Sequence, residues 1–356
     1  MYRFAIMPGD GIGPEIVREG MKSLEVASEI FGFKYEAVDM PYGTDHYLDT
    51  GVILPDGVFD ELRQMDAIFL GAIGDPRVET GLIERHIIAG VRFTLDLYIN
   101  LRPIQLYAEH LCPLKGISTS DIDFTFVREN TEGAYAQLHG FFKKGTADEV
   151  ATQQMLYTRK GVERTIRYAF ELCKKRNKKN RLTLVDKANA LRSHDIWTRT
   201  FEEVAQEYPD IETDHAYVDA CGMWMLKNPN WFDVIVTTNL FGDILSDIGA
   251  MLQGGLGIAA GGNIHPGQVS MFEPIHGSAP KYAGKNVANP LATILSAGLM
   301  LDHVGESEAA LAIERTVQEL LASGKVPDLS ARSGLKTDQI GDMVVEELRA
   351  SQEARA

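Results

Sequence analysis

Cysteine is scarce in this chain, and no apolar run is long enough to cross a bilayer. The 356 residues include only three cysteines, Cys112, Cys173 and Cys221, with no CxxC spacing. This odd number argues against a disulfide framework or a zinc finger and favours free thiols in a reducing compartment. Residues 1–7 lead into a glycine turn and show no signal-peptide pattern. We therefore expect a cytoplasmic protein that does not span a membrane.

Positive charge is also in short supply. The chain has 35 lysines and arginines against 50 acidic residues, a net charge of -15. Such a surface repels nucleic acid and anionic membranes. The hydrophobic share of 45% is ordinary for a globular enzyme, and the length suggests two domains. An acidic protein that binds an acidic substrate must gather its positive charge in a pocket, so the arginine clusters are the first candidates for a site.

Short apolar segments alternate with helical patterns, which predicts an α/β sheet covered by helices. Strands followed by turns are expected at residues 4–7, 66–70, 183–185 and 233–236. Pro14 predicts the first turn of a helix directly after the first strand and its glycine turn. The stretch GFFKKG at 140–145 indicates a protruding hairpin. Because ligands in open α/β sheets bind at the carboxyl ends of strands, each predicted strand end is a candidate site.

Three arginines form the first constellation. Arg92 and Arg102 lie ten residues apart across a predicted helix-to-strand transition, and Arg128 lies in the run VRENTEGAY. A single arginine is usually a surface charge. Three converging guanidinium groups would suit a dicarboxylate, since each can bind one carboxylate in bidentate geometry. Tyr135, seven residues after Arg128, can donate a proton in the same pocket.

Three aspartates, Asp219, Asp243 and Asp247, form the second constellation. Asp243 and Asp247 are one helical turn apart and share a face. Like charges at this spacing repel, a cost that a cation between them would offset; the alternative is a capped and solvated helix start. Ligation by carboxylates alone favours Mg²⁺ or Mn²⁺ over zinc. Such a metal can chelate a 2-hydroxy acid.

A rigid loop is predicted from 271 to 290, where small residues and prolines are dense. Such a loop lets a ligand approach backbone donors closely. The N-terminal run GDGIGP is a glycine turn but not a GxGxxG motif, and no acidic residue is cleanly placed about twenty positions further on. The sequence therefore predicts no Rossmann nucleotide site at the N-terminus.

Taken together, these segments resemble the isopropylmalate and isocitrate dehydrogenase family of β-decarboxylating dehydrogenases. The matching motifs, in the family's order, are GDGIGPE, LDLYINLRP, VRENTEGAY, VDKANAL, YVDA, NLFGDILSD and EPIHGSAPKYAGKNVANP. The resemblance, from Pro8 to about Leu329, implies a two-domain α/β fold distinct from Rossmann folds, with a sheet flanked by helices. It implies a first, cofactor-binding domain at 1–100 plus 252–356 and a second, dimerising domain at 101–251. The active sites would be shared across a homodimer interface, and a higher oligomer stays open.

The resemblance also implies catalytic roles. Arg92, Arg102 and Arg128 correspond to the clamp for the substrate carboxylates. Lys187 corresponds to the base that accepts the 2-hydroxyl proton, usually from the partner subunit. Tyr135 corresponds to the acid that protonates C3 after CO₂ has left.

The implied ligand sets follow from the same motifs. The Mg²⁺ or Mn²⁺ ligands correspond to Asp219, Asp243 and Asp247, with Asp219 contributed by the partner. The adenosine-binding loop corresponds to Glu273, His276, Gly277, Ser278, Ala279, Lys281, Tyr282 and Asn289. The pair Lys281 and Tyr282 is similar to NADP-dependent isocitrate enzymes, whereas the run VPDL at 326–329 is similar to NAD-dependent isopropylmalate enzymes. NAD is favoured, and NADP stays open.

The implied reaction is the oxidative decarboxylation of a malate-type 2-hydroxy acid. Ile87, Ile88 and Ala89 offer an apolar surface where bacterial isocitrate enzymes carry polar residues, which favours 3-isopropylmalate and leucine biosynthesis. Tartrate, D-malate, isocitrate and homoisocitrate stay open, because Arg85 stands where leucine-pathway enzymes often carry a glutamate. A non-catalytic regulatory subunit, a different class of protein, typically loses clamp or metal residues, and none is missing here.

Overall fold

A computed structural model describes residues 1–353, and these residues form two compact units. Unit 1 comprises 1–97, 105–119 and the described residues from 250 onward, and unit 2 comprises 98–104 and 120–249. Our predicted boundaries, 1–100 plus 252–356 and 101–251, differ from these units at residues 98–100, 105–119 and 250–251. The dimerising role of that domain stays a prediction.

Five strands make the sheet of unit 1, in the order β2-β1-β3-β12-β11. Their bounds are β1 Tyr2–Gly9, β2 Tyr35–Asp39, β3 Ala67–Ala72, β11 Ala260–Ile264 and β12 Ser270–Pro274. β1 pairs in parallel with β2 and β3, and β12 pairs in parallel with β3. Only the β11–β12 pair among these is antiparallel. The strands predicted at 4–7 and 66–70 are therefore confirmed as β1 and β3.

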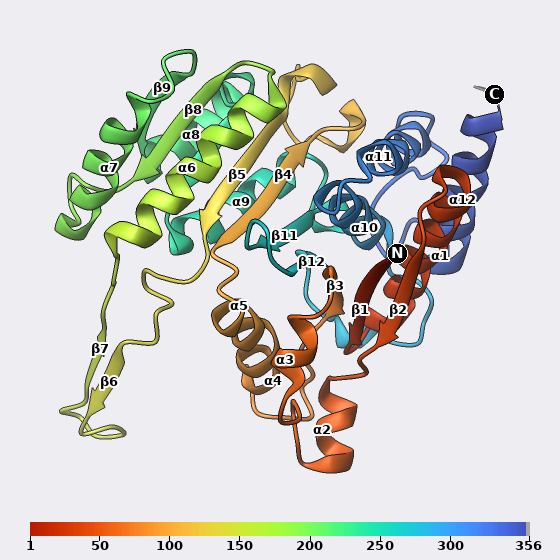
Figure 1. The fold of residues 1–356 in the computed structure, drawn as a ribbon, viewed down its shortest axis with the longest axis horizontal. Helices are drawn as coiled ribbons and strands as arrows, with labels where there is room; N and C mark the ends of the chain where they lie inside the picture. Colours follow the sequence, from red (N-terminus) through yellow and green to blue (C-terminus); the bar gives the residue numbers. More distant parts are fainter. Residues whose placement is uncertain (354–356) are drawn as a thin grey trace. The chain divides into compact units, whose positions relative to one another are not determined.

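Four long helices of unit 1 pack on one another around the apolar α10. They are α1 Gly13–Phe31, α10 Leu291–His303, α11 Ser307–Ala322 and α12 Thr337–Glu353. α1 begins at the glycine turn with Pro14 in its first turn, as predicted, and ends at Gly32 in the left-handed conformation (φ 76°). α1 packs against α10 and α12, and α10 packs against α11 and β12 (Figure 1).

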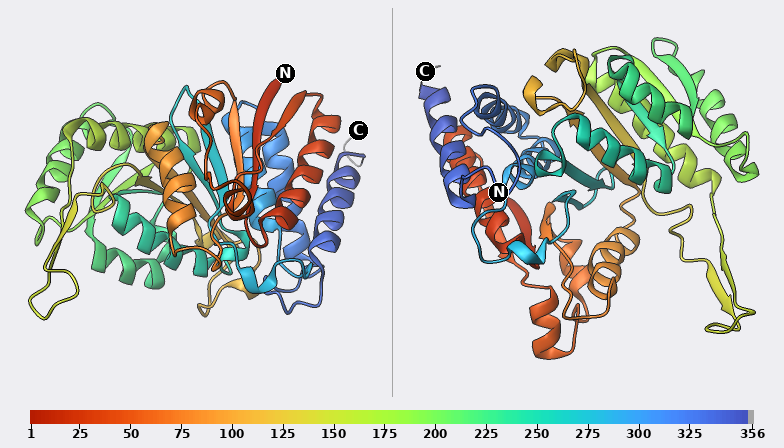
Figure 2. Two further views of the ribbon diagram at one scale, coloured as in Figure 1. Left: turned by 90° about the horizontal axis from the view of Figure 1, so that it is seen from below. Right: turned by 180° about the vertical axis from the view of Figure 1, so that it is seen from behind.

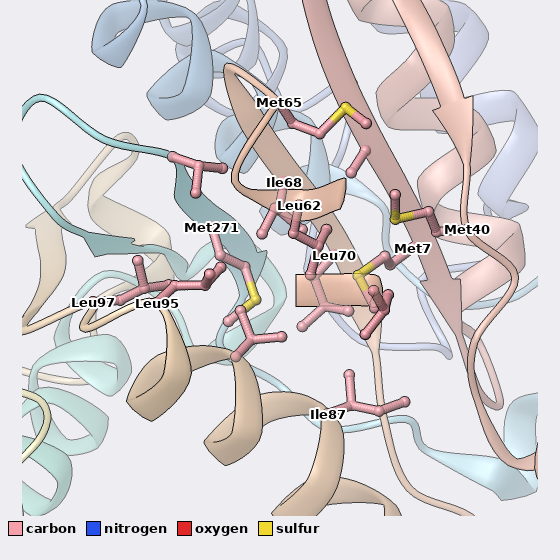
Figure 3. Packing of buried hydrophobic residues seen from close by; sticks show 14 of the residues in the cluster. Met7, Met40, Leu62, Met65, Ile68, Leu70, Ile87, Leu95, Leu97 and Met271 are labelled. Atoms are coloured by element: carbon pink, nitrogen blue, oxygen red, sulfur yellow. The ribbon is translucent and has the colours of Figure 1, made fainter. Parts of the chain in front are cut away.

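A hydrophobic core joins the strands of unit 1 to its short helices. These helices are α2 Thr44–Thr50, α3 Val58–Leu62, α4 Leu82–Glu84, a π-helical turn at Arg85–Ala89 and α5 Gly90–Thr94. Figure 3 shows Met7, Leu70 and Met271 from the strands beside Leu62 and Ile87 from the helices. Burying each large apolar side chain of this kind contributes about 1.5–3 kcal/mol.

Unit 2 contributes five strands to the sheet order, as β4-β5-β10-β8-β9. Its strands are β4 Ile99–Gln105, β5 Asp123–Glu129, β8 Arg181–Asp186, β9 Glu212–Tyr217 and β10 Val234–Thr237. β10 lies parallel to both β5 and β8, and β8 lies parallel to β9. The strands predicted at 183–185 and 233–236 are confirmed as β8 and β10. Their carboxyl ends face the same edge of the sheet, which is where ligands collect in such folds.

Four helices accompany this sheet: α6 Arg159–Arg176, α7 Asp195–Ala205, α8 Val218–Lys227 and α9 Asn239–Leu252. Short 3₁₀ turns in residues 1–353 lie at Glu109–Leu111, Thr119–Asp121, Arg192–His194, Pro229–Trp231, Leu256–Ile258 and Pro280–Tyr282. No helix in the described part of the chain is long and apolar enough to span a membrane.

The predicted hairpin is present in unit 2. Strands β6 His139–Phe142 and β7 Val150–Gln153 pair only with each other, in antiparallel register. Figures 1 and 2 show this hairpin extending away from the sheet and helices of unit 2. Phe141 and Phe142 are 55% and 64% exposed, so the hairpin carries apolar surface that unit 2 itself does not cover.

Candidate active site

Two of the predicted clamp arginines meet helix α9 at the carboxyl edge of the unit 2 sheet. Arg128, near the end of β5, donates from Nη1 to Asp243 Oδ1 (2.5 Å) and from Nη2 to Asn239 Oδ1 (2.7 Å). Arg102 on β4 donates from Nη1 to Ser246 Oγ (2.7 Å), and its Nη2 lies 3.8 Å from Asp243 Oδ1. Both guanidinium groups are buried, so their hydrogen bonds are needed to offset desolvation.

Gly242 allows α9 to approach Arg128 this closely. A Cβ at this position would lie 2.6 Å from Arg128 Cγ and 2.7 Å from Arg128 Cβ. Those atoms are at the base of the arginine side chain and cannot swing away without moving the whole group. The absence of a side chain at Gly242 therefore fixes where the Arg128 guanidinium lies.

Tyr135 belongs to the same group. Its hydroxyl donates to Asp243 Oδ2 (3.1 Å), and the Arg128 guanidinium carbon lies 5.8 Å from the ring centroid. Burial raises the pKa of Tyr135, and the negative charge of Asp243 adds to the rise. The phenol therefore keeps its proton at neutral pH. At 41% exposure it is still accessible to a substrate.

Asp243 and Asp247 lie together at Arg102, which approaches Asp247 Oδ1 to 3.3 Å. Burial raises the pKa of Asp247; Arg102 opposes this rise and Asp243 adds to it. Two carboxylates on one helical face are a hard-oxygen donor set that suits Mg²⁺ or Mn²⁺. Within the described residues of this single chain, no group of three His, Cys, Asp or Glu side chains could hold a metal ion. The third ligand stays a prediction.

Lys187 and Asp219 form a separate ion pair in unit 2. Lys187 follows β8, Asp219 lies in the first turn of α8, and Lys187 Nζ is 2.5 Å from Asp219 Oδ1. The hydrogen bond from Lys187 lowers the pKa of Asp219. The structure thus brings together the predicted base and one predicted metal ligand, and Asp219 is exposed enough to serve another partner.

The third clamp arginine, Arg92, lies on α5 in unit 1 and has a partner that we did not expect. Its Nη2 donates to Glu273 Oε1 (3.0 Å), which also accepts from Asn263 Nδ2 (2.8 Å). Glu273 was predicted in the cofactor loop, but it lies buried in β12. Its carboxylate is occupied by Arg92 and Asn263, so the loop begins after it. Among the described residues, the buried Nε of Arg92 meets no acceptor and remains able to bind a ligand.

The predicted cofactor loop lies against the glycine turn that follows β1. Ile12 N donates to Ser278 O (2.9 Å), and Ser278 Oγ donates to Gly74 O (2.5 Å). Ala279 has a left-handed φ of 39°, which turns the chain sharply. We had excluded a Rossmann site at the glycine turn; the structure gives this turn the role of supporting the loop.

The remaining loop residues lie around this turn. His276 Nδ1 is 3.1 Å from Gly277 O, and burial lowers the pKa of His276 and favours the neutral imidazole. Lys281 Nζ lies 4.7 Å from the centroid of the Tyr282 ring, and the lysine is exposed. Asn289 Oδ1 accepts from Leu291 N (2.9 Å) at the start of α10.

One predicted substrate contact needs correction. Ile87, expected to line the substrate pocket, is fully buried in the unit 1 core (Figure 3). Ile88 and Ala89 keep partly exposed surfaces, and Arg85 is exposed and pairs with Glu79 (3.2 Å). Only Ile88 and Ala89 therefore remain as candidates for an apolar substrate contact.

Two site residues escaped the sequence analysis. Asn239 accepts two hydrogen bonds from Arg128, although we weighed only the aspartates of its motif. Glu129 accepts from the backbone amides of Thr131 (2.7 Å) and Glu132 (2.9 Å) and thereby shapes the turn toward Tyr135. Burial raises the pKa of Glu129 to about 7. A glutamate directly after a site arginine and before an Asn-Thr turn was the available signal.

Comparison with known proteins identifies the family. A sequence profile described as isocitrate/isopropylmalate dehydrogenase matches residues 3–344. The chain belongs to this family. It is 47% identical to a 3-isopropylmalate dehydrogenase from Thermobifida fusca, over 97% of both chains. Another 3-isopropylmalate dehydrogenase, from Nocardia farcinica, is 46% identical over 96% of this chain and 98% of its own.

Solved structures agree on the fold. A crystal structure of isocitrate dehydrogenase from Methylococcus capsulatus is similar with a TM-score of 0.88 and 40% identity, over 98% of this chain and 100% of the other. A β-decarboxylating dehydrogenase from Thermococcus kodakarensis gives a TM-score of 0.79 at 32% identity, over 98% and 97%. The predicted α/β fold and family are confirmed, and the chain is an oxidatively decarboxylating dehydrogenase.

Proposed function

We propose that the protein oxidises and decarboxylates 3-isopropylmalate, as in leucine biosynthesis, with NAD as the hydride acceptor and Mg²⁺ or Mn²⁺ as the metal. The observation that carries the reaction type is the cluster of Arg102, Arg128 and Tyr135 around Asp243. The observation that favours this substrate is the similarity to curated 3-isopropylmalate dehydrogenases at 44–47% identity.

Arg102 and Arg128 would bind a substrate carboxylate. Both are paired with Asp243 of α9, so a substrate carboxylate would compete with Asp243 for their N–H groups. Arginine suits this role because it can bind a carboxylate through two parallel charge-assisted hydrogen bonds. The family motif assigns Arg92 to the same clamp, and its Nε, unused among the described residues, is available for a ligand.

Lys187 would accept the proton of the 2-hydroxyl group, and Tyr135 would later protonate C3. Lys187 Nζ lies 2.5 Å from Asp219 Oδ1 in an ion pair, so this pair must open and the lysine must be neutral before Nζ can accept a proton. When bound, Mg²⁺ or Mn²⁺ held by Asp243, Asp247 and a partner subunit's copy of Asp219 would supply acidification of the hydroxyl and stabilisation of enolate charge. The bound nicotinamide would supply the hydride acceptor, with its adenosine part near Ser278, Lys281, Tyr282 and Asn289.

A homodimer is part of this proposal. Met223 and Leu226 on α8 are 71% and 50% exposed, and Ile244 on α9 is 51% exposed. Large apolar side chains gathered on neighbouring helices mark interaction surfaces in soluble proteins. The exposed β6–β7 hairpin adds further apolar surface in unit 2. These faces support pairing with a second copy of the chain.

Isocitrate is the second candidate substrate, because a structure similar over nearly the whole chain is named isocitrate dehydrogenase. The deciding experiment is a comparison of kcat/KM for 3-isopropylmalate, isocitrate and D-malate, with NAD and with NADP. Contact between an isopropyl group and an apolar surface stabilises the transition state by about 1–3 kcal/mol. The kcat/KM for 3-isopropylmalate should therefore exceed that for D-malate by about one to two orders of magnitude. A higher kcat/KM for isocitrate or D-malate would overturn the substrate and leave the reaction type standing.

A further inference from the structure

The backbone of Lys187 is held by hydrogen bonds on both of its sides. Its carbonyl oxygen accepts from Ala190 N (3.0 Å) and Leu191 N (2.8 Å), which closes a tight turn. Its amide donates in another direction, to Nδ1 of His194 (3.2 Å). His194 N in turn donates to Leu191 O (3.0 Å). The turn from 187 to 194 thus folds back so that a side chain at its end binds the amide at its start.

His194 is itself fixed from several sides. It is fully buried in unit 2, and its Nε2 lies 3.2 Å from the hydroxyl of Tyr157. The Tyr157 ring meets the imidazole edge-on at a centroid distance of 5.2 Å, and the Phe241 ring lies 5.5 Å away. Tyr157 is held in turn by an edge contact with Trp197. The imidazole therefore has little freedom to rotate.

These contacts settle which nitrogen of His194 carries the proton. An amide that donates to Nδ1 requires a lone pair there, so the neutral ring carries its hydrogen on Nε2 and donates it to the Tyr157 oxygen. Burial lowers the pKa of His194, and the nearby Asp186 opposes this only in part. Burial also raises the pKa of Tyr157 to about 12. The pair is neutral at physiological pH, with one defined direction for each hydrogen bond.

We propose that His194 is a positioning residue for Lys187, acting through the Lys187 amide; this inference rests on the proposed role of Lys187 as the base. The ammonium group lies at the end of a flexible four-carbon stem, so its place depends on where the backbone of Lys187 is anchored. Without this acceptor the part-buried amide needs another partner, and the search for one would shift the lysine. Arg102 and Arg128 are held by side chains of α9, and none of the hydrogen bonds described above joins either of them to His194, so we expect carboxylate binding to persist without this anchor.

The test uses two substitutions that each keep one half of the imidazole. His194→Asn places an amide oxygen near the Nδ1 position and retains the acceptor for Lys187. His194→Gln places its polar atoms near the Nε2 position and retains only a partner for Tyr157. The two variants are similarly polar, and each alters one side of the ring. Comparing them separates the anchor from the general need for a polar side chain in this buried position.

We expect His194→Gln to lower kcat by about tenfold or more, because the part-buried Lys187 amide loses its acceptor and must find another. KM for 3-isopropylmalate should stay within about twofold, since substrate carboxylates are bound by other residues. His194→Asn should keep kcat within about threefold of the parent enzyme. A purely structural role would lower thermal stability in both variants and leave kcat per folded enzyme unchanged.

Equal kcat in the parent and His194→Gln enzymes would overturn the proposal, as would a loss in His194→Asn as large as in His194→Gln. An effect confined to KM would also overturn it. Lys187→Met, assayed in parallel, separates this outcome from a failure of the proposed function. Full activity in Lys187→Met would refute the role of the lysine itself, whereas an inactive Lys187→Met beside a fully active His194→Gln would refute only the positioning role.

Discussion

Replacing Gly242 by alanine should displace Arg128 and weaken substrate binding. In an exposed helix this substitution would stabilise the protein by about 1 kcal/mol, because alanine is the better helix former. At Gly242 the new methyl group would lie 2.6 Å from Arg128 Cγ and 3.1 Å from Cδ. Arg128 is buried and bonded to Asn239 and Asp243, so it has no empty space to move into.

Two opposing effects set the size of the change. Overpacking a buried site of this kind destabilises the folded protein by about 1–3 kcal/mol, and the higher helix propensity of alanine offsets about 1 kcal/mol of this. We therefore expect the free energy of unfolding to fall by about 0–2 kcal/mol. The effect on kcat/KM should be larger, because a shift of about 1 Å in a positioning group costs on the order of a hundredfold. Most of this loss should appear in KM, since Arg128 binds the carboxylate before and during the reaction.

The assay measures kcat and KM for 3-isopropylmalate together with thermal unfolding. Gly298→Ala on α10 is the matched control: a Cβ there would lie 3.6 Å from the nearest atom, Ala310 O, which is an ordinary contact. The control should keep its kinetics and gain stability by about 0.5–1 kcal/mol. A folded Gly242→Ala enzyme with the parent KM would refute the reasoning, and so would an equal KM increase in the control.

Three further outcomes are expected. Asp243→Asn should keep the fold but lose most activity, because the metal loses a carboxylate ligand. EDTA should abolish turnover of the parent enzyme, because it removes the metal. Full turnover in EDTA would contradict the metal assignment. Mixing inactive Lys187→Met and Arg128→Met chains should restore some activity if Lys187 acts in the partner's site, whereas verified hybrids without activity would place each site within one chain. His215→Gln should destabilise the protein more at about pH 5.5 than at about pH 8.5, as measured by chemical unfolding. Hydrogen bonding to Asp186 raises the pKa of His215 in the folded protein. The stabilisation by His215 is therefore complete below its pKa in the unfolded chain, near 6.5, and is lost as pH rises through its pKa in the folded protein. A uniform loss at both pH values would show that the His215 charge contributes nothing.

The fold was largely readable from the sequence because its strands are short apolar runs that end at polar or glycine turns. β1, β3, β8 and β10 lie where those runs predicted them. The hairpin at β6 and β7 was also predicted, from two adjacent aromatic residues followed by two lysines. These signals are local, so a single segment carries each of them.

The pairings within the site were not readable in the same way. The bond from Arg128 to Asp243 joins residues 115 positions apart, and that from Arg92 to Glu273 joins residues 181 positions apart. Which acidic group neutralises which arginine depends on how strands and helices pack, and no local pattern encodes it. Motif resemblance named the site residues but left their partners open, which is why Glu273 was assigned to a loop instead of β12.

The error at Ile87 had a different origin, since the sequence itself contained the argument against it. Successive residues of an α-helix are about 100° apart, so Ile87, Ile88 and Ala89 span about 200° and cannot all face one ligand. At least one of the three side chains must therefore point away from a substrate pocket. Burial in the core stabilises the protein most for the residue whose neighbours at helical spacing are also apolar. Ile83 and Val91, four residues before and after Ile87, are both fully buried beside it in the same core. Ile88 is partly buried against this same core, so it keeps only part of its apolar surface for a substrate.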